Sequence, residues 1–117
     1  MTLAFTICSI NYLAQARTLG ESLVATNPSV RFVVGLVDKL AGVTFEADKK
    51  LPFEWLEVQA LTIQNFEWMT AHYDITELNT AVKPYFIRHF FEKNPEVETV
   101  IYFDPDIIVF QPLDHLL

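Results

Sequence analysis

The sequence predicts an α/β protein in which a Rossmann-like, mostly parallel sheet is flanked by helices. Short apolar runs, typical of strands buried on both faces, alternate along the chain with segments of helical periodicity. A strand, a helix and a second strand follow one another within residues 3–37, and the right-handed crossover rule makes such strands parallel. The 117 residues fit one domain, and 51% hydrophobic residues can form its core.

The first half of the chain is predicted to hold three strands and one helix. The patterns predict strands at residues 3–8 and 31–37 and a short strand at residues 55–58. They also predict a helix at residues 12–24 and a loop at residues 41–52. Asn27 and Pro28 stop the helical pattern, and Asp38 ends the second strand.

The second half is predicted to be helical up to the last strands. Residues 65–72 favour a short helix, and Asp74 followed three residues later by Glu77 matches a capping box that opens another. Lys83 precedes Pro84, and the residue before a proline avoids helical geometry. We therefore expect a break at Lys83 and a new helix after it, which ends near residue 94.

Asp104 and Asp106 lie one residue apart between the apolar runs 100–103 and 107–110, both of which predict strands. We expect the pair at the end of a central strand, where parallel sheets bind ligands. Two carboxylates roughly 5 Å apart repel by about 3 kcal/mol at an effective dielectric near 20, and a divalent cation between them turns this repulsion into attraction. The pair therefore predicts a metal site, and a turn that only links two strands is the alternative.

Further polar residues follow the ends of the first two predicted strands. Ser9, Asn11 and Tyr12 come after the first strand, and Asp38 ends the second. Because the carboxyl ends of parallel strands share one edge of the sheet, we expect these residues to converge with the aspartates on one ligand site. Each alone also has a structural explanation, namely a helix cap for Asn11, core packing for Tyr12 and a turn for Asp38.

Composition excludes several classes of function. The formal net charge of -7 argues against nucleic acid as a partner, because phosphate binding needs clustered Lys and Arg. Cys8 is the only cysteine and lies in the first apolar run, which predicts a buried thiol and no disulfide within the chain. No basic stretch precedes that run and no apolar segment approaches ~18 residues, so we expect a cytoplasmic protein, free or peripheral to the inner face of a membrane.

The apolar content is high for so small a chain. A small monomer has much surface relative to its volume, so part of the apolar material is expected to face a partner subunit or a missing portion of the chain. The sequence therefore predicts a homo-oligomer formed through exposed apolar surface.

Three stretches resemble nucleotide-sugar glycosyltransferases of the GT-A fold, with the closest likeness to the glycogenin and bacterial lipopolysaccharide galactosyltransferase type. They are TICSINYLA at residues 6–14, NTAVKP at 79–84 and YFDPD at 102–106. The acidic motif alone is weakly specific. Its occurrence after the other two stretches, in this order and at this spacing, is more specific. The resemblance covers residues 1–117 as the N-terminal half of such an enzyme, and implies a C-terminal truncation and no efficient transfer by this chain alone.

The resemblance implies that Asp104 and Asp106 form a DxD motif, which binds Mn²⁺ or Mg²⁺ and through it the diphosphate of the donor. Asp106 would be a direct ligand, and Asp104 would contact metal, ribose or sugar hydroxyls. The metal would serve as a Lewis acid for the leaving diphosphate. Such enzymes commonly have a further histidine ligand. His115 follows Asp106 too closely to be assigned that role, and His72 and His89 have helical positions without ligand spacing.

The same resemblance implies a nucleotide-diphosphate sugar as donor, with a UDP-sugar favoured, and a glycan, lipid or protein of unknown identity as acceptor. Ser9, Asn11 and Tyr12 would border the nucleobase, where an aromatic ring can stack. Lys83 would contact the donor phosphate or sugar, although from its sequence context alone it resembles a solvated surface lysine.

The sequence is also compatible with two other functions. Haloacid dehalogenase-like phosphatases also place an Asp-x-Asp motif after an apolar strand, with Asp104 then the nucleophile and Asp106 the acid and base. In that family the motif usually follows the first strand, whereas here it comes last, and Ile108 stands where Thr or Val is usual. The other possibility is a non-catalytic, self-associating nucleotide-binding remnant.

Overall fold

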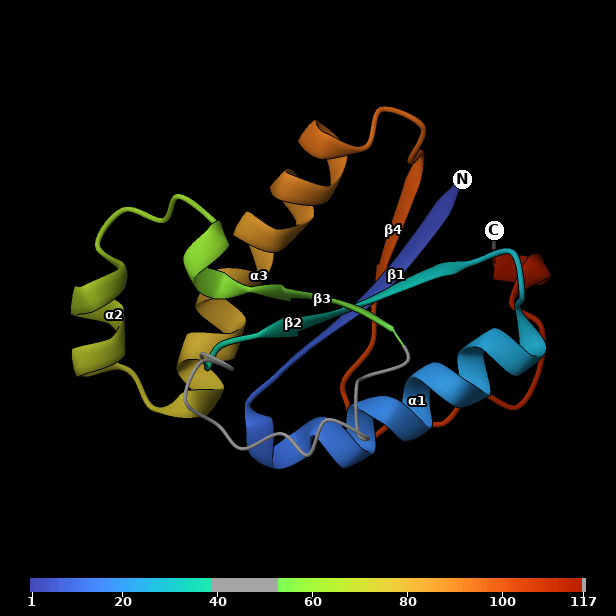
Figure 1. The fold of residues 1–117 in the computed structure, drawn as a ribbon, viewed down its shortest axis with the longest axis horizontal. Helices are drawn as coiled ribbons and strands as arrows, with labels where there is room; N and C mark the ends of the chain where they lie inside the picture. The colour runs from blue at the N-terminus through green and yellow to red at the C-terminus, as the bar shows by residue number, and fades with distance from the viewer. Residues whose placement is uncertain (39–52, 117) are drawn as a thin grey trace.

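The computed structural model describes residues 1–38 and 53–116 and confirms the predicted α/β class. Four parallel strands form one sheet in the order β3-β2-β1-β4 (Figure 1). The elements are β1 (Thr2–Cys8), η1 (Ile10–Tyr12), α1 (Leu13–Thr26), β2 (Arg31–Leu36), β3 (Glu54–Glu57), η3 (Val58–Ala60), α2 (Phe66–His72), α3 (Ile75–Lys93), β4 (Thr99–Tyr102) and η4 (Asp114–Leu116). The loop predicted at 41–52 lies outside the described residues.

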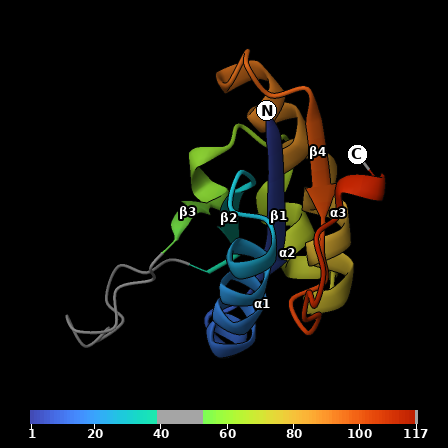
Figure 2. The same cartoon turned by 90° about the vertical axis from the view of Figure 1, so that its right-hand side faces the viewer.

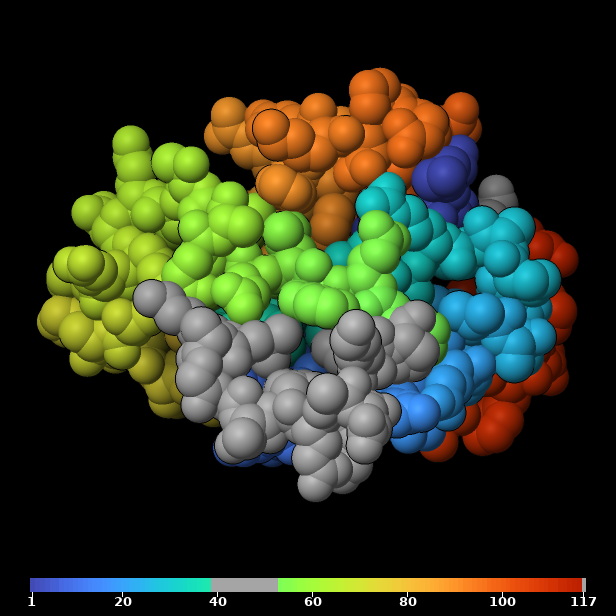
Figure 3. Space-filling view, in the orientation of Figure 1, coloured from blue at the N-terminus to red at the C-terminus, as the bar shows by residue number. Residues whose placement is uncertain are grey.

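The two long helices cover opposite faces of the sheet. In Figure 2 the strands run from β3 to β4, with α1 in front of the sheet and α3 behind it. Successive residues of β1 point to opposite faces, so Phe5 and Ile7 pack on the α3 side while Ala4 and Cys8 pack on the α1 side. On the face shown in Figure 3, the green chain after β3 lies beside the orange C-terminal half of α3. The predicted burial of Cys8 is confirmed.

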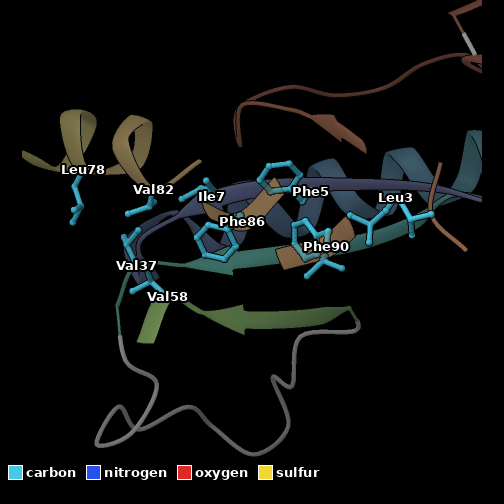
Figure 4. Close-up of a cluster of buried hydrophobic side chains, with 11 residues drawn as sticks. Leu3, Phe5, Ile7, Val37, Val58, Leu78, Val82, Phe86 and Phe90 are labelled. Atoms are coloured by element: carbon cyan, nitrogen blue, oxygen red, sulfur yellow. The ribbon is translucent and has the colours of Figure 1, made fainter. Parts of the chain in front are cut away.

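The larger hydrophobic cluster joins β1 to α3 through aromatic side chains (Figure 4). The ring centroid of Phe5 lies 6.3 Å from that of Phe86 and 5.1 Å from that of Phe90. Phe86 packs over Gly35 of β2, where an added Cβ atom would come within 2.9 Å of the Phe86 ring. This close contact allows α3 to pack close to the sheet at Gly35.

The break predicted at Lys83 is wrong, because α3 continues through Pro84 as one helix of 19 residues. An interior proline costs about 3 kcal/mol, since it removes a backbone hydrogen bond and crowds the preceding turn. The carbonyl of Thr80 loses that bond, but Thr80 and Pro84 both lie on the exposed side of the helix, where water can bind it. Buried side chains hold the helix against the sheet on both sides of the proline: Leu78, Val82, Phe86 and Phe90.

The start of α3 follows the sequence prediction. The Asp74 carboxylate accepts a hydrogen bond of 2.8 Å from the Glu77 amide, and the Glu77 carboxylate accepts one of 3.1 Å from the Asp74 amide. The predicted capping box is therefore confirmed. The start of α1 differs, since its first turn has no side-chain cap and Asn11 therefore does not cap this helix.

Two expectations for the chain around the aspartates are wrong. β4 pairs only with β1 and lies at the edge of the described sheet, so the motif does not follow a central strand. Residues 107–110 form no strand. Instead the chain after the motif runs along α1, where the Ser22 hydroxyl accepts a hydrogen bond of 2.9 Å from the Val109 amide. A backbone amide bonded to a side chain is not available for a sheet ladder.

Asn27 anchors the same C-terminal segment to the end of α1. Its side-chain oxygen accepts a hydrogen bond of 2.7 Å from the Leu113 amide, and its side-chain nitrogen donates one of 3.4 Å to the Gln111 carbonyl. Asn27 is only 5% exposed, so these groups have little access to water.

The variant Asn27→Ala is expected to lower the free energy of unfolding by about 1–3 kcal/mol, because it leaves the partly buried backbone groups of Leu113 and Gln111 without these partners. Urea denaturation measures this loss, and amide exchange at Leu113 should become faster. Thr18→Ala on the exposed side of α1 is the control, since its hydroxyl bonds only the Ala14 carbonyl, and it should change stability by no more than about 0.5 kcal/mol. Equal effects of the two variants would contradict the anchoring role.

The chain after the aspartates also carries exposed apolar side chains. Phe110 is 82% exposed, Leu116 is 70% exposed and Ile108 is 48% exposed. This surface agrees with the predicted excess of apolar material, and self-association through it stays a prediction. Within the described ranges, no helix is long and apolar enough to span a membrane.

Candidate functional site

Three neighbouring strands end at the same edge of the sheet. β2, β1 and β4 are adjacent and parallel, so the residues that follow them come together there. Figure 1 shows α1 and α3 starting near this edge. Asp38 follows β2, Ser9 follows β1 and Asp104 follows β4. The predicted placement of these three residues at one edge is therefore confirmed at the level of the fold.

Asp38 joins the end of β2 to the turn after β1. One oxygen of its carboxylate, Oδ2, accepts a hydrogen bond of 2.9 Å from the Ile10 amide. Ile10 opens the short helix η1, which carries Asn11 and Tyr12 at the edge of the sheet. Asn11 is exposed and Tyr12 is 49% exposed, whereas Ser9 is buried. The ring of Tyr12 is therefore accessible to a ligand and does not belong to the core.

Lys83, Tyr102 and Asp104 form a connected group on the other side of β1. The Lys83 ammonium lies 3.9 Å from the centroid of the Tyr102 ring. The Tyr102 hydroxyl lies near the Asp104 carboxylate, and its ring packs edge-on against Phe5 with centroids 5.2 Å apart. This arrangement connects two residues singled out from the sequence, through a tyrosine to which the sequence analysis gave no role.

The position of Tyr102 in the sequence indicates that it can contact Asp104. Residues two apart in an extended segment face the same side, so a tyrosine two positions before Asp104 can reach its carboxylate. The contact with Lys83 had no such signal, because it depends on how α3 crosses the sheet.

The acidic pair changes the proton affinity of its neighbour. Burial first, then the nearby Asp104 carboxylate, raise the pKa of Tyr102 to about 12, and Asp106 adds to the same shift. Tyr102 therefore stays protonated and acts as a hydrogen-bond donor, and both carboxylates lie close to it. Burial and the Asp38 charge raise the pKa of the Cys8 thiol to about 12, which excludes a thiolate ligand at neutral pH.

Asp106 lines a groove of about 260 Å³ between the acidic turn and the first half of α1. The wall on the α1 side comes from Ala14, Gln15 and Thr18. Asp104 and Asp106 are both exposed, so a ligand can reach the pair. Solvent and salt screen the mutual repulsion of two exposed carboxylates.

The histidines do not complete a metal site within the described chain. There, no group of three or more His, Cys, Asp or Glu side chains is placed to hold a metal ion. The His72 ring stacks on Trp68 with centroids 4.3 Å apart, His89 lies on α3 beside Phe90, and His115 lies in η4. Within residues 1–38 and 53–116, no histidine is therefore grouped with Asp104 and Asp106 as a third ligand.

Asn79 lies one helical turn before Lys83 on α3, so the two side chains share one side of the helix. The side-chain oxygen of Asn79 is buried and has no hydrogen-bond partner among the described residues. Buried oxygens of this kind nearly always have a partner, which makes Asn79 a candidate acceptor for a bound ligand.

The predicted residues form three local groups. Asp38 belongs with the turn that carries Asn11 and Tyr12, Lys83 belongs with Tyr102 and Asp104, and Asp106 faces α1. All three lie at the carboxyl edge, and none of the described hollows encloses them together.

Comparison with known proteins shows the fold. No protein-family model and no curated protein matches the sequence. The structure is similar to that of an active-site mutant of LgtC, a GT-A glycosyltransferase, with a TM-score of 0.58 and 19% sequence identity. The match covers 99% of this chain and 41% of the LgtC chain. The chain therefore has a glycosyltransferase-like fold and spans about two fifths of the length of that relative.

Proposed function

We propose that this chain is the nucleotide-sugar-binding part of a metal-dependent glycosyltransferase, which takes a UDP-sugar as donor and a glycan, lipid or protein as acceptor. The observation that carries the proposal is the grouping of Lys83, Tyr102 and Asp104 at the carboxyl edge of the parallel sheet, with Asp106 two residues further along the chain. Ligands of open α/β sheets bind beyond this edge. The fold shared with LgtC supports the same function.

The residues present fit a small, hard cation such as Mn²⁺ or Mg²⁺. Cations of this kind are commonly held by one or two carboxylates, with substrate phosphates and water in the remaining positions. Asp106 would hold the cation directly, and Asp104 would hold the cation or hydroxyls of the donor. When bound, the cation would stabilise negative charge on the leaving diphosphate.

Lys83 would bind a phosphate group of the donor. Its contact with the Tyr102 ring keeps the ammonium at the edge of the sheet, 3.9 Å from the ring centroid. A cation–π contact at an exposed site contributes about 0.5–1 kcal/mol, whereas a hydrogen bond to a charged group contributes about 1.5–3 kcal/mol. A phosphate oxygen can therefore draw the ammonium from the ring, and Asn79 would accept a hydrogen bond from a donor hydroxyl.

The turn after β1 would hold the nucleobase. The half-exposed ring of Tyr12 offers a flat apolar surface for stacking, and Ser9 and Asn11 would border the base. One carboxylate oxygen of Asp38 accepts the hydrogen bond from the Ile10 amide, and the other would accept one from a ring N–H of the base. With this division of roles, base and diphosphate would bind at the ends of neighbouring strands.

Removal of metal is expected to abolish the binding of UDP. Isothermal titration of the protein with UDP in the presence of Mn²⁺ should give a saturable signal, and EDTA should weaken the affinity by about 100-fold or more, which corresponds to roughly 2.7 kcal/mol. UMP is the matched control, because it lacks the second phosphate and should bind weakly with or without Mn²⁺.

Equal affinity for UDP in Mn²⁺ and in EDTA would contradict the proposal. A phosphate-release assay on a generic phosphate monoester with Mg²⁺ distinguishes the transferase from the alternative phosphatase, in which Asp104 is the nucleophile. Turnover of the monoester that is lost in Asp104→Asn would favour the phosphatase, and absence of turnover together with metal-dependent UDP binding supports the transferase.

A further inference from the structure

A second hollow lies apart from the carboxyl edge. It has a volume of about 630 Å³ and lies between the chain after β3 and the C-terminal half of α3. Both segments appear side by side in Figure 3, and the hollow shares no lining residue with the groove at Asp106. Small-molecule sites usually measure about 300–1,000 Å³, so the hollow has room for a small ligand.

Two positive side chains line this hollow in a protein of formal net charge -7. Arg88 uses its Nε atom for a hydrogen bond of 2.8 Å to Glu92, and its two terminal nitrogens have no hydrogen-bond partner in residues 1–38 and 53–116. Lys93 likewise forms no ion pair with a described residue. Together with Glu92, the lining therefore keeps one uncompensated positive charge and several free N–H donors.

The remaining lining groups are neutral hydrogen-bonding groups. Burial and the nearby Lys93 charge lower the pKa of His89, so its imidazole is neutral at neutral pH and offers one donor and one acceptor. Thr62, Gln64 and Tyr85 add hydroxyl and amide groups to the same wall. A ligand that satisfies these groups must carry several hydroxyls of its own.

We infer that this hollow binds a phosphorylated sugar, with its phosphate on Arg88 and Lys93 and its hydroxyls on His89, Thr62 and Gln64. A guanidinium presents its N–H donors as a planar fork that matches phosphate oxygens, and a lysine adds a point charge. A phosphate monoester carries nearly two negative charges at neutral pH, so two cations suit it better than they suit a single carboxylate. The inference does not depend on the metal site.

A titration with glucose 6-phosphate in EDTA tests this site, because EDTA removes any metal ion through which the two aspartates could bind the phosphate. Amide chemical shifts of ¹⁵N-labelled protein should move in residues 60–64 and 85–93 and should saturate. Arg88→Gln and Lys93→Gln should each weaken the affinity by about tenfold or more.

Arg17→Gln is the matched control. Arg17 makes the same kind of exposed contact, with a glutamate four residues later, at 2.9 Å on α1, so this variant removes equal charge from the other side of the molecule. It should leave the affinity for glucose 6-phosphate unchanged. An equal loss in Arg17→Gln and Arg88→Gln would show that only net charge matters and would overturn the site.

Two further ligands distinguish a phosphorylated sugar from a neutral sugar and from a sugar that carries a carboxylate. Glucose carries the hydroxyls without the anion and should give no saturable shifts, and glucuronate carries one negative charge and should bind more weakly than glucose 6-phosphate. Glucuronate of equal affinity would overturn the assignment to phosphate. Shifts confined to residues 104–108 would overturn the location.

Discussion

Asp106→Asn is expected to abolish the Mn²⁺-dependent binding of UDP. Asparagine keeps the size of the side chain and removes its charge, so the groove against α1 should keep its shape. Within the described chain, no further carboxylate or histidine is grouped with the pair to replace the lost ligand. We expect the affinity to fall by about 100-fold or more, equivalent to roughly 2.7 kcal/mol, in an isothermal titration with UDP and Mn²⁺.

Asp114→Asn provides the control for this experiment. Asp114 is an exposed aspartate in η4, outside the groove that Asp106 lines, and its replacement changes the net charge by the same amount. UDP should bind to this variant as it does to the unchanged protein. Full affinity in Asp106→Asn, with an unchanged thermal midpoint, would show that the metal is not held by this aspartate.

The parts of the fold that follow local rules could be predicted from the sequence. Unbroken apolar runs marked β1 and β2, because strands covered by helices on both faces need no polar side. The capping box at Asp74 and Glu77 could be predicted because both partners lie within one turn of the chain. Alternation of strands and helices also predicts that Asp38, Ser9 and Asp104 lie at one edge.

The parts decided by tertiary packing could not be predicted. The rule for residues before proline favours a break at Lys83, but buried side chains on either side of Pro84 hold α3 straight through it. The apolar run at 107–110 has the composition of a strand, yet it lies along α1 through a bond from Val109 to Ser22. Both errors arise because the deciding contacts are far apart in the sequence.

The continuity of α3 also explains what was missed at the site. An unbroken helix keeps Asn79 and Lys83 one turn apart on the same side, and brings Lys83 over the ring of Tyr102. A break at Lys83 would have separated the two residues. The site therefore depends on the core packing that carries the helix past its proline.

Phe86→Ala is accordingly expected to cause the largest loss of stability. Phe86 is fully buried, packs on Phe5 and fills the space over Gly35, so its removal leaves a cavity between α3 and two strands. Truncation of a buried phenylalanine costs about 3–5 kcal/mol. A domain of this size is stable by roughly 5–15 kcal/mol, so urea denaturation should show a much lower midpoint.

Phe91→Ala on the same helix is the matched control. Phe91 is 43% exposed, so its loss should change the free energy of unfolding far less than the loss of Phe86 does. Phe86→Leu keeps part of the buried volume and should fold even if Phe86→Ala does not. Because α3 carries Lys83 to the edge of the sheet, a shifted helix in Phe86→Leu should weaken UDP binding as well as stability, whereas Phe91→Ala should change neither. Equal stability of the Phe86 and Phe91 variants would contradict the role of Phe86 in holding this helix.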